Sequence, residues 1–289
     1  TAQMAVSDVD KKYLGRFASN FKIENPLLAQ NLFQVSGIFT MLSGKIVKAR
    51  KLRKSVAIQN IKSVDIYIRI IWHAREGIKI LEQYIFPMVA NYGELKVLSY
   101  KLRASFYHLY VLFYNSPIID PIEGPESIFS PPLDEEDRHT DHSSLNQLIF
   151  SDIMSSSHTE KHGCNLDTED AIHQFMDIWS DFMIPPVDYR PIALRYFQEA
   201  VSLAENHLSR SHPLRLSLMV EYSAFMYDCL YEREESRRIA ELTVTEAYKA
   251  REGMDIDSYE DSAALFEALK VMMIWGLDEN IDGSKISKA

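Results

Sequence analysis

Cysteine and glycine are scarce in this sequence. Its 289 residues include only 2 cysteines and 10 glycines. Two cysteines cannot form the disulfide framework of a small secreted domain, so we expect a reducing compartment, the cytosol or the nucleus. Because glycine is common in turns, so low a content disfavours a turn-rich β architecture and favours long helices.

The chain also lacks an excess of positive charge and a long apolar run. Its formal net charge is −10, which disfavours a surface for nucleic acid or anionic lipid. Segment 105–119 is free of Asp, Glu, Lys and Arg, but it is shorter than the roughly 20 residues that a transmembrane helix needs. Charges at Asp8, Asp10 and Lys11 replace an early apolar run, so we expect no secretory signal. We predict neither nucleic acid nor membrane among the partners.

Catalytic motifs are missing as well. The sequence contains no nucleophile–base motif, no glycine-rich phosphate loop and no dinucleotide fingerprint. His158, His162 and Cys164 could suggest zinc, but HTEKH has its glutamate at the third position and is not the His-Glu-x-x-His motif. We therefore predict that the chain is not an enzyme and holds no cofactor and no metal.

Apolar residues recur with a helical period through the first part of the chain. Val9, Tyr13, Phe17 and Phe21 follow one another at four-residue intervals. This stripe is too large for a solvent-facing terminal helix, so we expect it in a dimer interface. We predict helices over 8–22, 33–59 (bent or broken near Gly44), 63–92 and 94–114.

The C-terminal part, from Arg195 to Trp275, predicts three consecutive amphipathic helices. Apolar residues from Leu214 to Cys229 fall at i, i+4, i+8, i+11 and i+15, which is one face of a helix. The His212-Pro213 pair opens this helix, because proline suits a first helical turn.

Residues 117–186 differ from the rest of the chain. They hold seven of the 11 prolines and an acidic run at 134–137, which is typical of a long loop or partly disordered insertion. One short helix is expected within them, at 171–183. We predict one helical domain over 1–275 that contains this insertion, followed by a flexible tail at 276–289.

Three motifs of the C-terminal part occur in a characteristic order. They are Tyr-x-Gln-Glu-Ala from Tyr196, His-Pro-x-Arg-Leu from His212, and Ser-Tyr-x-Asp-Ser from Ser258, followed by Trp275. This order resembles the last three helices of the 14-3-3 family of phosphoserine/phosphothreonine-binding dimers. Residues 97–114 resemble the family's fifth helix, and 41–51 weakly resemble its third. The resemblance implies an all-α fold of about nine antiparallel helices that form a concave groove.

The family captures phosphate with a lysine, two arginines and a tyrosine, because a dianionic phosphate needs several fixed donors. In the fifth-helix match, Lys101 corresponds to a groove lysine. His108 and Leu109 stand where the family has an arginine and the tyrosine. The resemblance therefore implies a degenerate phosphate site.

The third-helix match departs from the family too. Lys51 corresponds to the other arginine and Gly44 to a lysine, for which Lys45 or Lys48 could substitute. The basic cluster 45–54 can equally be a solvated helix face. His108 can equally be a satisfied core histidine; as a ligand, it would become charged below about pH 6.5.

The match in the last helices implies the rest of the groove. Val220, Leu265 and Trp275 correspond to its apolar wall. Glu221 replaces the asparagine that holds the bound peptide's backbone. An acid at this position would sit badly beside a phosphate.

The leading hypothesis from these features is a dimeric adapter for phosphorylated proteins, as a homodimer or a heterodimer with a paralogue. Its own tail resembles a C-terminal ligand with a phosphosite at Ser287. The alternative is a structural paralogue that dimerises or scaffolds without binding phosphopeptides.

Overall fold

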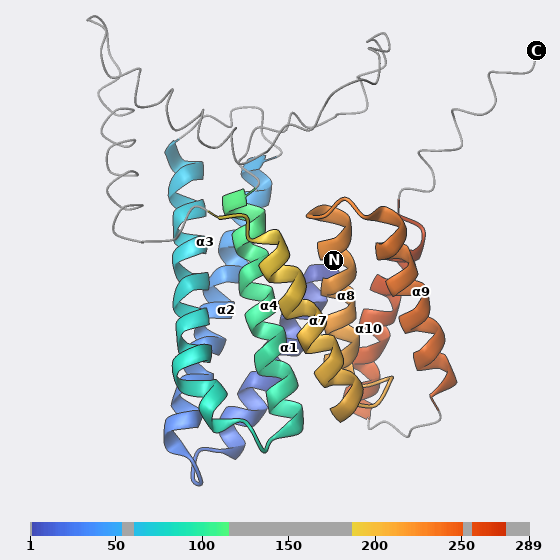
Figure 1. Cartoon of the computed structure of the whole chain (residues 1–289). Helices are drawn as coiled ribbons and strands as arrows, with labels where there is room; N and C mark the ends of the chain where they lie inside the picture. Colours follow the sequence, from blue (N-terminus) through green and yellow to red (C-terminus); the bar gives the residue numbers. More distant parts are fainter. Residues whose placement is uncertain (1, 54–60, 116–186, 251–255, 276–289) are drawn as a thin grey trace, which may run out of the picture.

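The computed structural model describes residues 2–53, 61–115, 187–250 and 256–275 (Figure 1). Within these ranges the chain forms eight α-helices and no β-strand, which confirms the predicted all-α class. The α-helices are α1 Ala2–Asn20, α2 Pro26–Arg53, α3 Ile61–Ile80, α4 Gly93–Tyr110, α7 Arg190–His207, α8 Pro213–Asp228, α9 Arg233–Lys249 and α10 Ile256–Met273.

Two helices differ from their predicted course. Helix α2 begins at Pro26 and continues through Gly44, so of the predicted break or bend there the break is wrong. Helix α3 ends at Ile80, and the chain passes Pro87 in a π-helical turn followed by a 3-10 turn. Proline lacks an N–H and disfavours a helical residue before it, which explains the change of helix type.

The C-terminal part contains four helices rather than the predicted three, because α7 precedes α8. The predicted start of α8 is confirmed. Pro213 lies in its first turn, and Nδ1 of His212 accepts a hydrogen bond from the backbone N–H of Leu214 at 3.2 Å. The short-range signal was sufficient here because a helix start depends on a few adjacent residues.

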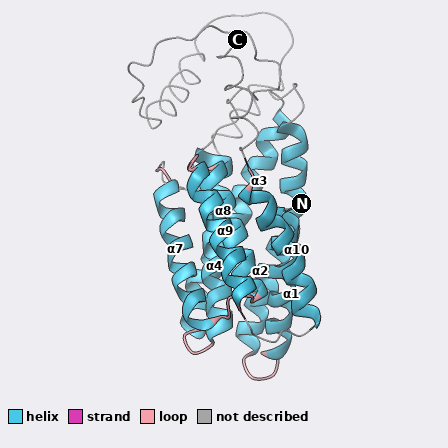
Figure 2. Ribbon diagram, turned by 90° about the vertical axis from the view of Figure 1, so that its right-hand side faces the viewer, coloured by secondary structure: helices cyan, strands magenta, loops and turns pink. Residues whose placement is uncertain are grey.

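Figures 1 and 2 show the helix axes lying roughly parallel, with the chain going up and down along them. Helices α8, α9 and α10 contact one another, while α2, α3 and α4 form a second set onto which α7 packs through α4. Helix α1 lies where the two sets meet and contacts α2, α4, α8 and α10. One apolar core runs through all of these helices.

The apolar stripe of α1 belongs to this core. Val9, Tyr13, Phe17 and Phe21 are each at most 9% exposed within the single chain. The ring of Phe21 packs edge-on against Tyr92, with centroids 4.7 Å apart. The premise that this helix faces solvent is therefore wrong, because its own chain already covers the stripe; a dimer interface through these residues stays a prediction.

Several sequence predictions fall outside the described residues. These are the insertion character of 117–186, the helix at 171–183, the candidate zinc ligands, the tail and its phosphosite at Ser287. In the parts of the chain that the structure does describe, no helix combines the length and apolarity needed to cross a membrane.

Candidate functional site

One face of α4 carries three polar side chains into the core. Lys101, Ser105 and His108 are spaced i, i+4 and i+7, so they point in the same direction. All three are buried, and the Lys101 side chain is completely inaccessible to solvent. So deep a charge requires a partner of opposite sign.

The carboxylate of Glu221, on α8, contacts all three of these side chains. Its Oε2 lies 3.3 Å from Nζ of Lys101 and accepts a hydrogen bond from Oγ of Ser105 at 2.7 Å. Its Oε1 lies 3.4 Å from Nδ1 of His108. Glu221 therefore ties α8 to α4 through both carboxylate oxygens.

Helix α1 supplies a second acid. Nζ of Lys101 donates a short hydrogen bond to Oδ2 of Asp10, whose side chain is 1% exposed. The other oxygen, Oδ1, has no hydrogen-bond partner among the described residues. We call Asp10, Lys101, His108 and Glu221 the charge cluster.

The environment shifts every pKa in the charge cluster. Burial is the largest influence on Asp10 and raises its pKa to about 6, although Lys101 acts in the opposite direction. Burial also favours neutral Glu221, but Lys101 and the hydrogen bonds from His108 and Ser105 outweigh it and lower the pKa to about 2. Burial alone would lower the pKa of Lys101, whereas Asp10 and Glu221 raise it above its ordinary value. At neutral pH, two acids thus face two cations.

His108 occupies a core position between α7 and α8. Its ring makes edge contacts with Phe197 and Phe225, at centroid distances of 6.0 and 5.3 Å. Burial by itself would lower the pKa of His108, but interactions with Cys229 and Glu221 raise it to about 10. In this conformation the pKa of His108 thus lies above the value of about 6.5 expected of it as a ligand, because Cys229 and Glu221 favour the charged imidazolium.

The apolar residues assigned to the groove wall are covered too. Val220 and Leu265 are fully buried, on α8 and α10. Trp275 is half-buried just beyond α10, with its ring 5.0 Å from that of Tyr227. Most of the surface that the resemblance assigns to a ligand is thus closed in this conformation.

The basic residues predicted on α2 have a different setting. Lys45 is half-buried and Lys48 is exposed, and no described hydrogen bond or ion pair joins either to the charge cluster. Lys51 is within α2, but its side chain lies outside the described part. The structure therefore brings together Lys101, His108 and Glu221, but not the lysines of α2.

Asp10, Ser105 and Cys229 were not predicted as members of a site. A signal for Asp10 was present, since it precedes Leu14 by four residues and Phe17 by seven and therefore shares their buried face. An acid on the apolar face of a helix indicates a buried partner of opposite charge.

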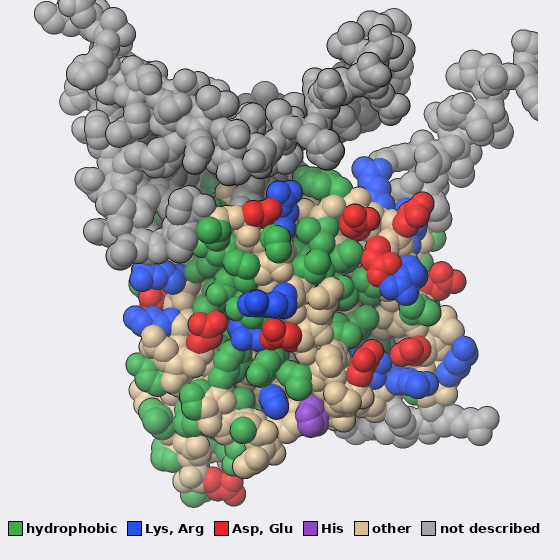
Figure 3. All heavy atoms as spheres, viewed as in Figure 1, with side chains coloured by type: hydrophobic (Ala, Val, Ile, Leu, Met, Phe, Trp, Pro, Cys, Tyr) green, Lys and Arg blue, Asp and Glu red, His purple; other side chains and the backbone are tan. Residues whose placement is uncertain are grey.

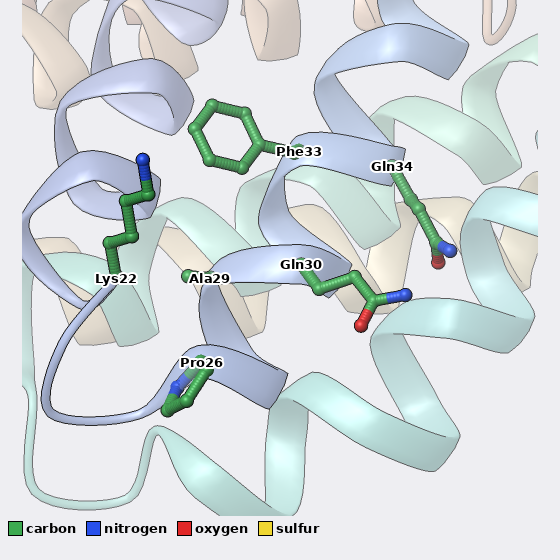
Figure 4. Close-up of a pocket in the computed structure, with 6 residues that line it drawn as sticks. All are labelled: Lys22, Pro26, Ala29, Gln30, Phe33 and Gln34. Atoms are coloured by element: carbon green, nitrogen blue, oxygen red, sulfur yellow. The ribbon is translucent and has the colours of Figure 1, made fainter.

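A shallow hollow of about 540 Å³ lies at the start of α2 (Figure 4). None of the residues predicted for the ligand site lines it. Its lining offers one ammonium group among apolar and amide side chains, which does not provide the several fixed donors of a phosphate site. The lining residues are Lys22, Pro26, Ala29, Gln30, Phe33 and Gln34.

The surface shows no concentration of positive charge on the face drawn in Figure 3, where basic and acidic side chains alternate. In the described ranges, no group of three or more His, Cys, Asp or Glu residues is arranged to hold a metal ion.

Comparison with known proteins places the resemblance in the C-terminal helices. The family model "14-3-3 protein" matches residues 190–275, which span α7 to Trp275. The 14-3-3-like protein GF14 epsilon of Arabidopsis thaliana is 30% identical over 97 residues, covering 33% of this chain and 38% of that protein. The 14-3-3 protein I of Plasmodium falciparum is 31% identical over 83 residues, covering 28% and 32%.

A similar match is found with 14-3-3 protein 9 of Solanum lycopersicum, which is 29% identical over 98 residues. This match covers 34% of the chain and 38% of the relative. The chain thus spans about a third of the length of these relatives. Residues 190–275 thus match the 14-3-3 family, and the all-helical architecture is consistent with a divergent relative of that family.

Proposed function

We propose that this chain is an adapter that binds phosphorylated serine or threonine segments on the face formed by α4, α8 and α10. The observation that carries the proposal is the placement of two cations, Lys101 and His108, on one face of α4 and opposite α8. By the resemblance, Lys101 corresponds to a groove lysine of the family and His108 to an arginine of its phosphate site. Val220 and Leu265 would supply the adjacent apolar contacts.

Phosphate binding at this site would be weak. Glu221 lies 3.3 Å from Nζ of Lys101, so a dianionic phosphate would meet a carboxylate at the same ammonium group. An imidazolium also lacks the bidentate fork of the guanidinium that it replaces. We expect Lys45, Lys48 or Lys51 of α2 to supply the missing positive charge. The tail around Ser287 is one candidate ligand, and a second copy or a paralogue is the expected dimer partner, in the cytosol or nucleus.

A second function, scaffolding without phosphate recognition, is favoured by a different observation. Both cations of the charge cluster already pair with acids of the same chain, and Lys101 is inaccessible. A phosphate would have to displace Asp10 before it reached Nζ.

One titration separates the two functions. A panel of labelled phosphopeptides and their unphosphorylated twins is added to the full chain, and anisotropy is measured. The adapter function requires that phosphate tighten binding of at least one peptide by more than tenfold, since charge-assisted contacts contribute on the order of 1.5–3 kcal/mol each. Equal affinity within every pair would reject it in favour of the scaffold.

A further inference from the structure

Helix α1 covers the face that we propose for the ligand. Asp10 contacts Lys101 on α4, Lys12 forms an ion pair with Asp261 on α10, and the ring of Tyr13 lies 5.7 Å from that of His212 at the start of α8. One amphipathic helix thus contacts each of the three helices that form this face.

We propose that α1 is an internal ligand of this face and must leave before a partner can bind. The ligand class that the face recognises is then an amphipathic helix whose acidic side chain pairs with Lys101, as Asp10 does. The proposal rests on the proposed function only in taking the α4, α8 and α10 face as the binding face.

The chemistry at the centre of the contact makes α1 displaceable. Asp10 and Lys101 are both withdrawn from water, which is costly unless every polar atom is satisfied. Oδ1 of Asp10 is not satisfied by any described residue. Apolar residues of similar volume in place of Asp10 and Lys101 would hold α1 more tightly.

The contacts at the edge of α1 are equally modest. Lys12 and Arg16 form ion pairs with Asp261 and Glu94 at 2.7 and 2.5 Å, and all four side chains are at least 20% exposed. Exposed pairs of this kind contribute little each. Burial of Val9, Tyr13 and Leu14 favours the closed state, so closure is a balance that a partner can shift.

The first test loosens α1 without touching the buried face. Lys12→Glu places like charges beside Asp261, and the double variant Lys12→Glu/Asp261→Lys restores attraction within the chain. The probe is a labelled synthetic peptide of residues 2–20, added to the full chain. We expect it to bind Lys12→Glu about fivefold more tightly than wild type, and the double variant no more tightly than wild type.

The peptide itself carries the matched control. Asp10→Asn in the peptide removes the partner of Lys101 and should weaken binding about tenfold. Asp8→Asn removes an exposed acid whose described ion pair is with Lys11 of the same helix, and should change nothing. Equal affinities for the two altered peptides, or no binding to Lys12→Glu, would overturn the proposal.

The second test locks α1 in place. Lys12→Cys and Asp261→Cys, in a Cys164→Ser background, are joined by a short bismaleimide; the single Lys12→Cys protein treated with the same reagent is the control. Locking should abolish binding of the 2–20 peptide and of any phosphopeptide. If phosphopeptides bind the locked and control proteins equally, the proposal is wrong although the proposed function stands. If the 2–20 peptide binds the control protein and no phosphopeptide does, the proposed function is wrong although the proposal for α1 stands.

Discussion

Asp10 of α1 and Lys101 of α4 form an ion pair inside the protein, with side chains 1% and 0% exposed, although 91 residues separate them in sequence. Glu221 shares the same ammonium group and links the pair to His108. Helix α1 is thus held against α4 and α8 by charge as well as by apolar packing.

Removing Asp10 should destabilise the fold. Asp10→Asn leaves Lys101 buried with Glu221 as its only acid in the charge cluster, and breaking a buried pair costs roughly 3–5 kcal/mol. Urea unfolding followed by circular dichroism measures the loss. Asp8→Asn, at an exposed position of the same helix, should stay within about 0.5 kcal/mol of wild type. Similar midpoints for both variants would contradict the assigned pairing.

The pKa of His108 predicts how stability depends on pH. Its folded value of about 10 lies above the ordinary 6.5, so its contribution is fully present below pH 6.5 and is lost as pH rises towards 10. The free energy of unfolding of wild type should therefore fall across this window by more than that of His108→Gln, by several kcal/mol. Parallel profiles for the two proteins from pH 6 to 10 would show that His108 titrates normally.

The basic residues of α2 should matter for phosphate and not for folding. Lys51→Glu should weaken the best phosphopeptide by more than tenfold, because it replaces a favourable charge with a repulsive one. Helicity and thermal midpoint should not change. Lys249→Glu, at an exposed position on α9, is the matched charge reversal. If Lys51→Glu and Lys249→Glu weaken peptide binding equally, the α2 lysines contribute only through the net charge of the protein.

Charged residues in the stripe of α1 should destabilise the packing of α1 against its own chain instead of merely separating subunits. Tyr13 and Phe17 lie in the core, so Tyr13→Glu and Phe17→Glu should each cost roughly 3–5 kcal/mol. Phe33→Glu, at a side chain that is 49% exposed on α2, should have little effect on stability. Light scattering and circular dichroism on all three variants distinguish the outcomes: folded monomers from the first two would restore the stripe as an interface.

The tail prediction is independent of the described structure. A synthetic peptide of the last six residues, with and without phosphate at Ser287, is added to protein truncated after Asp282. Phosphate-dependent thermal stabilisation of the truncated protein is expected, because binding to the folded state raises its stability. If neither peptide changes the thermal midpoint of the truncated protein, the tail is not a ligand of this chain.

Local signals in the sequence were enough for part of this fold. The start of α8 at His212-Pro213 and the shared face of Lys101 and His108 follow from neighbouring residues and helical spacing. The partner of Lys101 did not follow, because Asp10 reaches it only through the packing of α1 against α4. The packing of the α1 stripe within its own chain did not follow either, because periodicity indicates that a face is covered, but not whether its own chain or another covers it.

The apolar stripe of α1 can pack against only one surface at a time, either that of its own chain or that of another. If α1 leaves the face of α4, α8 and α10, Val9, Tyr13, Phe17 and Phe21 lose their cover together and need another apolar surface. A second chain could provide that surface, in which case occupancy of the binding face and subunit association would be thermodynamically linked and each would strengthen the other by the same factor. The oligomeric state of this protein would then report how much of its ligand is bound.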